Sequence, residues 1–120
     1  MTNNQLKNRT KQFSLSILNL IEKMPNSIST RVVINQVAKS ATSVGANYRA
    51  VCRARSDKEF VAKLNIVLEE ADETQFWLEI IEGMKWINQS ELVGLQKEAN
   101  ELVAIFVSTL KTVNNRLNNK

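Results

Sequence analysis

Few residues in this sequence belong to the types that perform catalysis or bind metals. The 120 residues contain no His and one Cys, Cys52. The absence of His excludes the Ser-His-Asp and Cys-His catalytic systems, zinc sites that use His, and di-iron sites built on Glu-x-x-His. A single Cys also excludes a disulfide within the chain. The composition therefore argues against the common kinds of enzyme, and we expect no catalytic residue and no cofactor.

Cys52 is a candidate nucleophile because Arg49, Arg53 and Arg55 lie close to it in sequence. Neighbouring cations favour the reactive thiolate form of a cysteine. Since the sequence places no His or carboxylate to act as a base, we expect a structural cysteine.

An acidic run, Glu69-Glu70-Ala71-Asp72-Glu73, is the one pattern that suggests a metal site. On a helix, Glu69 and Glu73 lie one turn apart on the same face. Without His or a second carboxylate cluster, this pair would hold at most a weakly bound hard cation such as Mg²⁺. We therefore expect no metal site.

Charge is distributed unevenly along the chain. Residues 1–58 carry ten Lys or Arg and two Asp or Glu, whereas residues 59–120 carry six and ten. A folded domain with this sequence has separate basic and acidic surfaces. Such surfaces suit either an anionic partner or neighbouring copies of the chain that meet basic side to acidic side.

The elements that position these charges are predicted to be four helices. Apolar residues recur at helical spacing, and the sequence has only three Gly and one Pro. Pro25 ends the first helix, Ser29 or Thr30 caps the second, and Ser56 with Glu59 forms a capping box for the third. Small residues around Gly45 indicate a close helix approach there. We predict an all-α, up-down-up-down four-helix bundle forming a single domain over residues 1–120, with helices near 4–23, 30–53, 57–83 and 90–114 and a frayed tail.

The second predicted helix carries a basic stripe on the face opposite its core. The stripe is about 33 Å long at ~1.5 Å per residue. Forked guanidinium groups in such a row suit successive phosphates of RNA or DNA, with little dependence on base sequence. The alternatives are a solvated face or one paired with acids of another subunit. The candidate nucleic-acid-binding residues are Arg31, Lys39, Arg49, Arg53 and Arg55.

The third predicted helix has a second apolar face. Phe76 and Ile80 fall on the same side as the acidic run, with Trp77 at its border. A helix with apolar groups on two sides is usually covered on both. We therefore expect a homo-oligomer interface, which the basic helix of a neighbouring copy is a candidate to meet, at Glu69, Asp72, Glu73, Phe76, Trp77 and Ile80.

No segment resembles a membrane span or an export signal. The apolar stretch 13–21 is interrupted by Asn19, and the longest apolar run, 102–107, is far short of the roughly 20 residues that a membrane span needs. With a lone thiol, we expect a cytoplasmic protein without membrane contact.

Two segments resemble a known family. Residues 36–44 (QVAKSATSV) with Asn47, and residues 55–60 (RSDKEF) with Leu64, are similar to the core pattern of the four-helix-bundle proteins encoded within intervening sequences of bacterial large-subunit ribosomal RNA. The similarity extends over residues 5–115. The sequence departs from the family where Tyr48-Arg49 replaces the usual Glu-Gly, and where Glu69-Glu70 replaces a frequent Gly-Ser.

The accessory variability proteins of diversity-generating retroelements are similar in architecture. Those proteins form homopentamers, bind nucleic acid and associate with a reverse transcriptase. The resemblance implies a ring of five for this chain and supplies no catalytic residue.

Three hypotheses follow. The leading one is a non-enzymatic oligomeric protein that binds RNA or other nucleic acid through the basic stripe. The alternatives are an adaptor whose ring recruits a partner protein such as a reverse transcriptase, and a protein whose charges serve only its own assembly.

Overall fold

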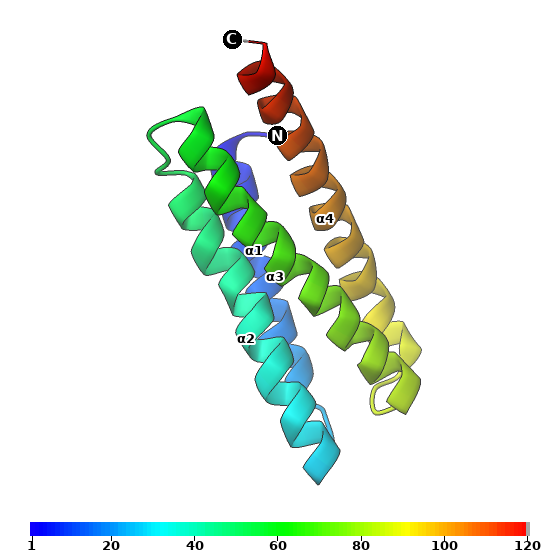
Figure 1. Cartoon of the computed structure of the whole chain (residues 1–120). Helices are drawn as coiled ribbons and strands as arrows, with labels where there is room; N and C mark the ends of the chain where they lie inside the picture. The colour runs from blue at the N-terminus through cyan, green and yellow to red at the C-terminus, as the bar shows by residue number, and fades with distance from the viewer. Residues whose placement is uncertain (120) are drawn as a thin grey trace.

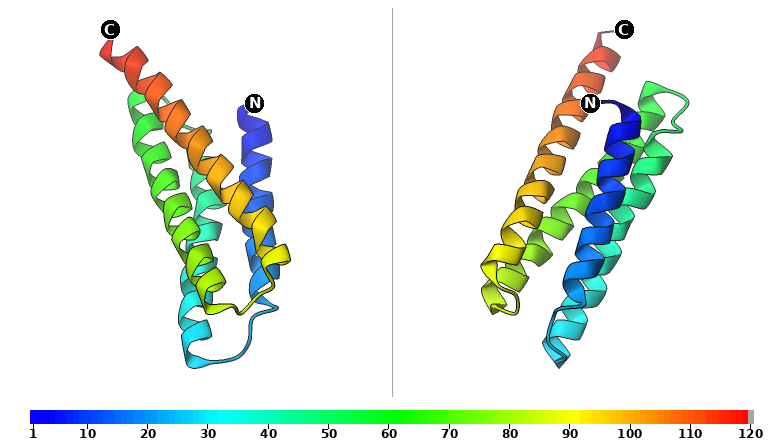
Figure 2. Two further views of the ribbon diagram at one scale, coloured as in Figure 1. Left: turned by 90° about the vertical axis from the view of Figure 1, so that its right-hand side faces the viewer. Right: turned by 180° about the vertical axis from the view of Figure 1, so that it is seen from behind.

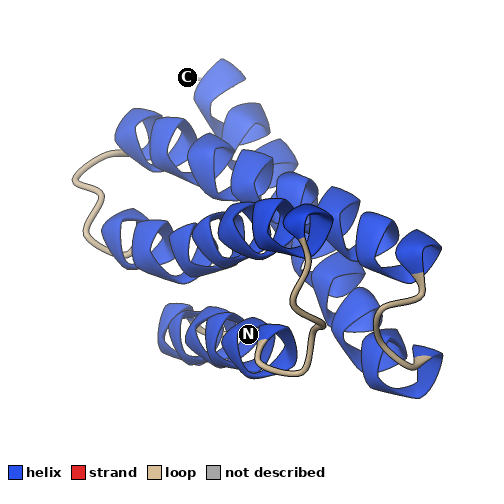
Figure 3. Ribbon diagram, turned by 90° about the horizontal axis from the view of Figure 1, so that it is seen from below, coloured by secondary structure: helices blue, strands red, loops and turns tan. Residues whose placement is uncertain are grey.

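The computed structural model describes residues 1–119, which form four helices and no strand (Figures 1 and 3). Each helix runs antiparallel to the one before it, and the bundle measures 53 × 22 × 19 Å. This confirms the predicted all-α, up-down-up-down fold. The helices are α1 (Asn3–Ile21), α2 (Ile28–Val51), α3 (Asp57–Met84) and α4 (Gln89–Asn118).

The helix starts differ from the predictions in two details. Ser27, not Ser29 or Thr30, caps α2, because Ser27 has the extended backbone of a cap and its Oγ accepts the Thr30 N–H at 3.2 Å. Ser56 caps α3 as predicted and accepts the Glu59 N–H at 3.1 Å. The Glu59 carboxylate does not close the capping box, because it pairs with Lys63 Nζ at 3.0 Å. This pairing lowers the pKa of Glu59.

The end of α4 was predicted too early. The helix continues to Asn118 instead of ending near residue 114. Arg116 holds this last turn against the start of α3, with its Nε and Nη2 donating to the two carboxylate oxygens of Asp57 at 2.8 and 2.9 Å. The predicted frayed tail is therefore wrong as far as Asn118, and Lys120 lies outside the described residues.

The core is the set of apolar stripes that the sequence predicts. Along α3, residues at alternating spacings of three and four are almost fully buried, and the largest fully buried side chains are Phe13 of α1 and Phe106 of α4. Two polar side chains enter this core and satisfy each other, since Thr74 Oγ1 and Ser40 Oγ lie 2.8 Å apart. The buried α3 residues are Leu64, Val67, Ala71, Thr74, Leu78 and Ile81.

The bundle is not equally closed on all sides. In the left view of Figure 2, α4 is tilted relative to α1, and the two helices separate toward the chain termini. α1 accordingly packs far more extensively on α2 than on α4. Grooves lie on both flanks of α1, one toward α2 and one toward α4. Across residues 1–119, no helix is both long and apolar enough to cross a membrane.

Candidate nucleic-acid interface

The five predicted stripe residues are all exposed. α2 presents Arg31, Lys39 and Arg49, whereas Arg53 and Arg55 lie in the connection to α3, because α2 ends at Val51 and not near residue 53 as predicted. α2 itself contains no Asp or Glu, so its cations have no acidic neighbour on their own helix. The stripe residues are therefore open to solvent, and their role in binding stays a prediction.

The cations of this face differ in how strongly they are compensated. Lys39 lies near Glu70 of α3, where its attraction opposes the burial that raises the pKa of that carboxyl. Arg55 interacts with Glu59, whose pKa it helps to lower. Arg49 and Arg53 have no ion-pair partner within residues 1–119. The uncompensated charge is thus concentrated near the C-terminal end of α2.

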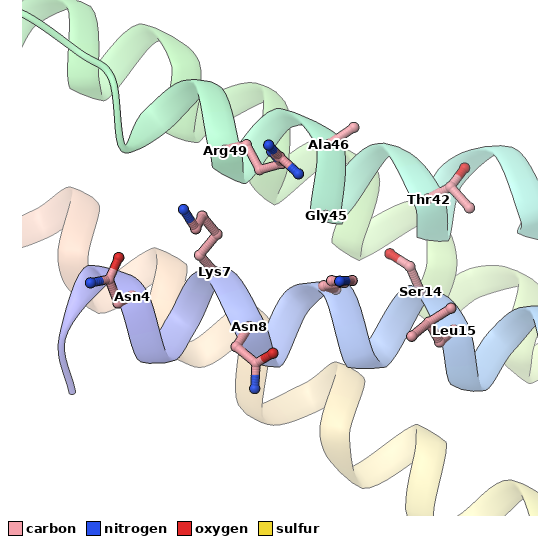
Figure 4. A pocket seen from close by; sticks show the side chains of 10 residues that line it. Asn4, Lys7, Asn8, Ser14, Leu15, Thr42, Gly45, Ala46 and Arg49 are labelled. Carbon is pink, nitrogen blue, oxygen red and sulfur yellow. The ribbon is translucent and has the colours of Figure 1, made fainter.

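α1 adds two cations to this end that the sequence analysis missed. Lys7 and Lys11 lie one turn apart on α1, and together with Arg49 they line a groove of about 510 Å³ between α1 and α2. Figure 4 shows Lys7 and Arg49 extending from the two helices into the space between them. The sequence could have predicted this, because the antiparallel hairpin places the start of α1, with Lys7 and Lys11, beside the end of α2. The other lining residues are Asn4, Asn8, Ser14, Leu15, Thr42, Gly45 and Ala46.

A close contact between α1 and α2 forms the floor of this groove. A Cβ on Gly45 would lie 2.8 Å from Ser14 Oγ and 3.4 Å from the Thr10 carbonyl oxygen, so only glycine fits without a shift. The Ser14 hydroxyl lies 2.7 Å from the Ala41 carbonyl oxygen and ties the two helices together. The predicted close packing at Gly45 is confirmed, and it fixes the spacing of the cations above it.

The opposite flank of α1 has a groove of similar size but different electrostatics. This second groove, of about 570 Å³, lies between α1 and α4. Arg9 donates through Nε and Nη2 to Glu98 at 2.7 Å each, and its Nη2 also lies 2.7 Å from Glu101. Hydrogen bonding to Glu98 raises the pKa of Arg9. Lys23 pairs with Glu91 at 2.7 Å. The cations of this flank are therefore neutralised by acids of α4.

Tyr48 and Cys52, the neighbours of Arg49 and Arg53, take part in the packing between helices. Tyr48 is 3% exposed, and its ring stacks on Phe106 with the centroids 6.0 Å apart. Burial raises the pKa of Tyr48 to about 12. Cys52 is half-buried, with Sγ 3.9 Å from the Asn3 carbonyl oxygen. Tyr48 packs in the core and is not among the residues that line the groove.

The predicted interface on α3 is brought together as one acidic and aromatic surface. Phe76 is 49% exposed and meets Trp77 edge to face at 4.9 Å. Trp77 Nε1 donates to the Glu73 carboxylate at 3.3 Å. Glu69 and Asp72 are exposed beside them. Trp77 and Ile80 are only half exposed, because both also pack against the core. Within residues 1–119, no group of three or more acidic or Cys side chains is arranged to hold a metal ion.

Comparison with known proteins identifies the family. The model of the 23S rRNA-intervening sequence proteins matches residues 2–108. The chain belongs to this family. The match covers both grooves of α1, the whole of α2 and the acidic surface of α3.

A solved member of the S23 ribosomal protein family has the same fold. It is a protein of unknown function from Bacteroides thetaiotaomicron, 32% identical to this chain, and the two superpose with a TM-score of 0.83. The alignment covers 92% of this chain and 99% of the other. No curated protein matches the sequence. The comparisons thus give the family and the fold and leave the activity to be inferred from the surface.

Proposed function

We propose that this member of the 23S rRNA-intervening sequence family binds RNA or another nucleic acid through the basic face of α2, without catalysis. The observation that carries the proposal is the group of cations at the α1–α2 end of the molecule that have no acidic partner in the described chain: Lys7, Lys11, Arg49 and Arg53. Exposed, uncompensated cations on one face attract the phosphate backbone and release its counterions on binding.

The family supports this proposal, because its description refers to ribosomal RNA. The chain also lacks His, so the acid–base groups that commonly cleave RNA are reduced to carboxylates, Lys and Tyr. We accordingly place the function with binding proteins, in the cytoplasm, where a single thiol stays reduced.

The test is fluorescence anisotropy with labelled structured RNA, single-stranded DNA and duplex DNA, from low to physiological salt. The variant Arg49→Glu/Arg53→Glu should weaken binding roughly 100-fold and lower the slope of log affinity against log salt by about 2. The control, Lys97→Glu/Lys111→Glu, reverses two exposed cations of α4 and changes the net charge equally. Undiminished affinity in the α2 variant, or equal loss in both, would contradict the proposal.

We also propose that copies of the chain associate through the outer face of α3, in a ring that the resemblance to retroelement accessory proteins sets at five. The specific observation is that α3 exposes Phe76 and, about three turns earlier, Ile66, which is 47% exposed, on a helix rich in acidic residues. The basic face of α2 on a neighbouring copy has the complementary charge. Such a ring would suit an adaptor for a partner protein such as a reverse transcriptase.

Light scattering after size-exclusion chromatography tests this second proposal. The variant Phe76→Glu should convert the oligomer to monomer, whereas Val93→Glu, at a 56% exposed position on α4, should leave it intact. A monomeric wild-type protein would overturn the proposal. If salt alone dissociates the oligomer and the protein binds no nucleic acid, the basic and acidic surfaces serve only to assemble the oligomer.

A further inference from the structure

The groove between α1 and α2 differs from an ordinary basic surface because its cations converge. Lys7 and Lys11 of α1 and Arg49 of α2 line a single hollow of about 510 Å³. Figure 4 shows Lys7 on one helix and Arg49 on the facing one. No acidic residue lines the groove. The only acid on either hairpin helix or its turn is Glu22, at the other end of α1. A positive site of this kind lacks a counterion from the described chain.

We propose that this groove binds one nucleoside phosphate monoester, as a free mononucleotide or as the phosphorylated end of an RNA strand. The phosphate is held by Lys7, Lys11 and Arg49, and the nucleoside lies along Leu15 and Ala46. The inference rests on the proposed nucleic acid binding and gives that surface a defined site.

The charge of the site selects a terminal phosphate. A phosphate monoester carries about −1.5 to −2 charge and three acceptor oxygens, whereas an internal phosphodiester or a carboxylate carries about −1. Three cations from two helices therefore match the monoester better in charge and in number of donors. The Arg49 guanidinium supplies forked N–H groups, and the two lysines supply mobile point charges.

The rest of the groove suits a nucleoside without selecting a base. Its volume lies within the roughly 300–1,000 Å³ of small-molecule sites. Leu15 is 44% exposed and offers an apolar surface, while Asn4, Asn8 and Thr42 offer donors and acceptors. No aromatic side chain lines the groove, so a base has no ring on which to stack. We therefore expect little preference among the four bases.

Backbone amide NMR of the full chain provides the first test, with adenosine 5′-monophosphate, adenosine and inorganic phosphate as probes. The monophosphate should shift amides in residues 4–15 and 42–49 and bind about tenfold more tightly than either fragment. Lys7→Ala/Lys11→Ala should weaken the binding of the monophosphate about tenfold. The control Lys97→Ala/Lys111→Ala should weaken this binding less than about twofold. Equal weakening by both variants, or shifts elsewhere in the bundle, would overturn the inference.

A groove-filling variant provides the second test, because it leaves every charge in place. Ala46→Leu should weaken the monophosphate about fivefold and leave inorganic phosphate unchanged. A short RNA with a 5′-phosphate should bind about fivefold more tightly than the same RNA with a 5′-hydroxyl, and Ala46→Leu should abolish this difference. An unchanged preference for the phosphorylated RNA in this variant would contradict the groove as its site.

The outcomes separate this inference from the proposed function. RNA binding that depends on Arg49 and Arg53, with no monophosphate response in the groove, would overturn the inference and keep the function. Monophosphate binding without salt-dependent RNA binding would keep the site and overturn the function. Groove amides that change with protein concentration, and that the monophosphate fails to perturb, would show that a second copy occupies the groove and would also overturn the inference.

Discussion

The two flanks of α1 are alike in size and opposite in charge compensation. The α1–α2 groove measures about 510 Å³ and is lined by Lys7, Lys11 and Arg49, whereas the α1–α4 groove measures about 570 Å³ and is lined by Lys23, just beyond the end of α1. On the α4 side Arg9 and Lys23 are paired with Glu98 and Glu91 at 2.7 Å. On the α2 side the cations face a helix without acids. The comparison teaches that two grooves of similar volume on one helix can differ in charge compensation, because α4 supplies acids to one flank and α2 supplies none to the other.

The largest expected effect is the raised pKa of Tyr48, which distinguishes the buried side of α2 from the side that faces the groove. Burial raises the pKa of Tyr48 in the folded protein to about 12, above the ordinary value of about 10, so the phenol ionises less readily when the protein is folded. Below pH 10 the phenol is protonated in both states. Between pH 10 and 12 it ionises only in the unfolded chain, so stability falls as pH rises.

Near-ultraviolet absorbance of phenolate reports this titration directly, because Tyr48 is the only Tyr in the chain. Adding RNA should leave the curve unchanged, and Tyr48→Phe should reduce the loss of stability between pH 10 and 12. A pKa near 10 in the folded protein would place the ring in contact with solvent and with bound RNA.

An acid placed on α2 should make the two grooves equivalent. Ala46 lines the α1–α2 groove three residues before Arg49, so Ala46→Glu supplies the carboxylate that this flank lacks. RNA affinity should fall about tenfold, while the isosteric control Ala46→Gln should change it less than about threefold. Anisotropy titrations measure the RNA affinity of both variants. An equal loss of affinity with Glu and Gln would show that the size of the new side chain, and not its charge, is the cause.

Removing one cation from each flank should affect stability on one side only. Arg9→Met breaks the partly buried contacts with Glu98 and should lower the free energy of unfolding by about 1–2 kcal/mol. Lys11→Met removes an uncompensated charge and should change it by less than about 0.5 kcal/mol. Urea denaturation measures the free energy of unfolding of both variants. A larger loss for Lys11→Met than for Arg9→Met would contradict the view that only the α4 flank has compensated cations.

Two glycine substitutions give the smallest expected effects. Gly45→Ala forces Ser14 Oγ away from the Ala41 carbonyl oxygen, which should outweigh the gain in helix propensity and cost about 1 kcal/mol. Gly94→Ala, with no atom within 4 Å of the added Cβ, should stabilise by up to about 1 kcal/mol. Thermal unfolding checks both, and Ser14→Ala added to Gly45→Ala should recover part of the loss. A stabilising Gly45→Ala would show that the α1–α2 contact is loose.

The sequence was sufficient for the fold because local and long-range signals agree. Apolar spacing gave the four helices, Ser56 marked the start of α3, and the small residues around Gly45 marked the α1–α2 contact. The end of α4 was predicted wrongly because the contact that holds it, Arg116 with Asp57, joins residues far apart in the sequence. No local pattern records such a contact.

The candidate site was predicted in part. The exposed cations of α2 follow from a helical wheel, but Lys7 and Lys11 join them only when two helices are placed side by side. The compensation of Lys39 by Glu70 is likewise visible only across the α2–α3 contact. Charge on one helix can be predicted from periodicity, whereas its partner on another helix requires the structure.

Where α4 tilts away from α1, ion pairs join the first hairpin to α4, with Lys23 and Glu91 exposed at one end and Arg9 more sheltered beside Glu98. Dissolved ions screen such pairs, and the exposed one most. Raising the salt concentration therefore has two effects in one experiment. It lowers the affinity for an anionic ligand, and it weakens the ion pairs that join the first helix region to α4. A melting curve recorded at each salt concentration separates the two effects.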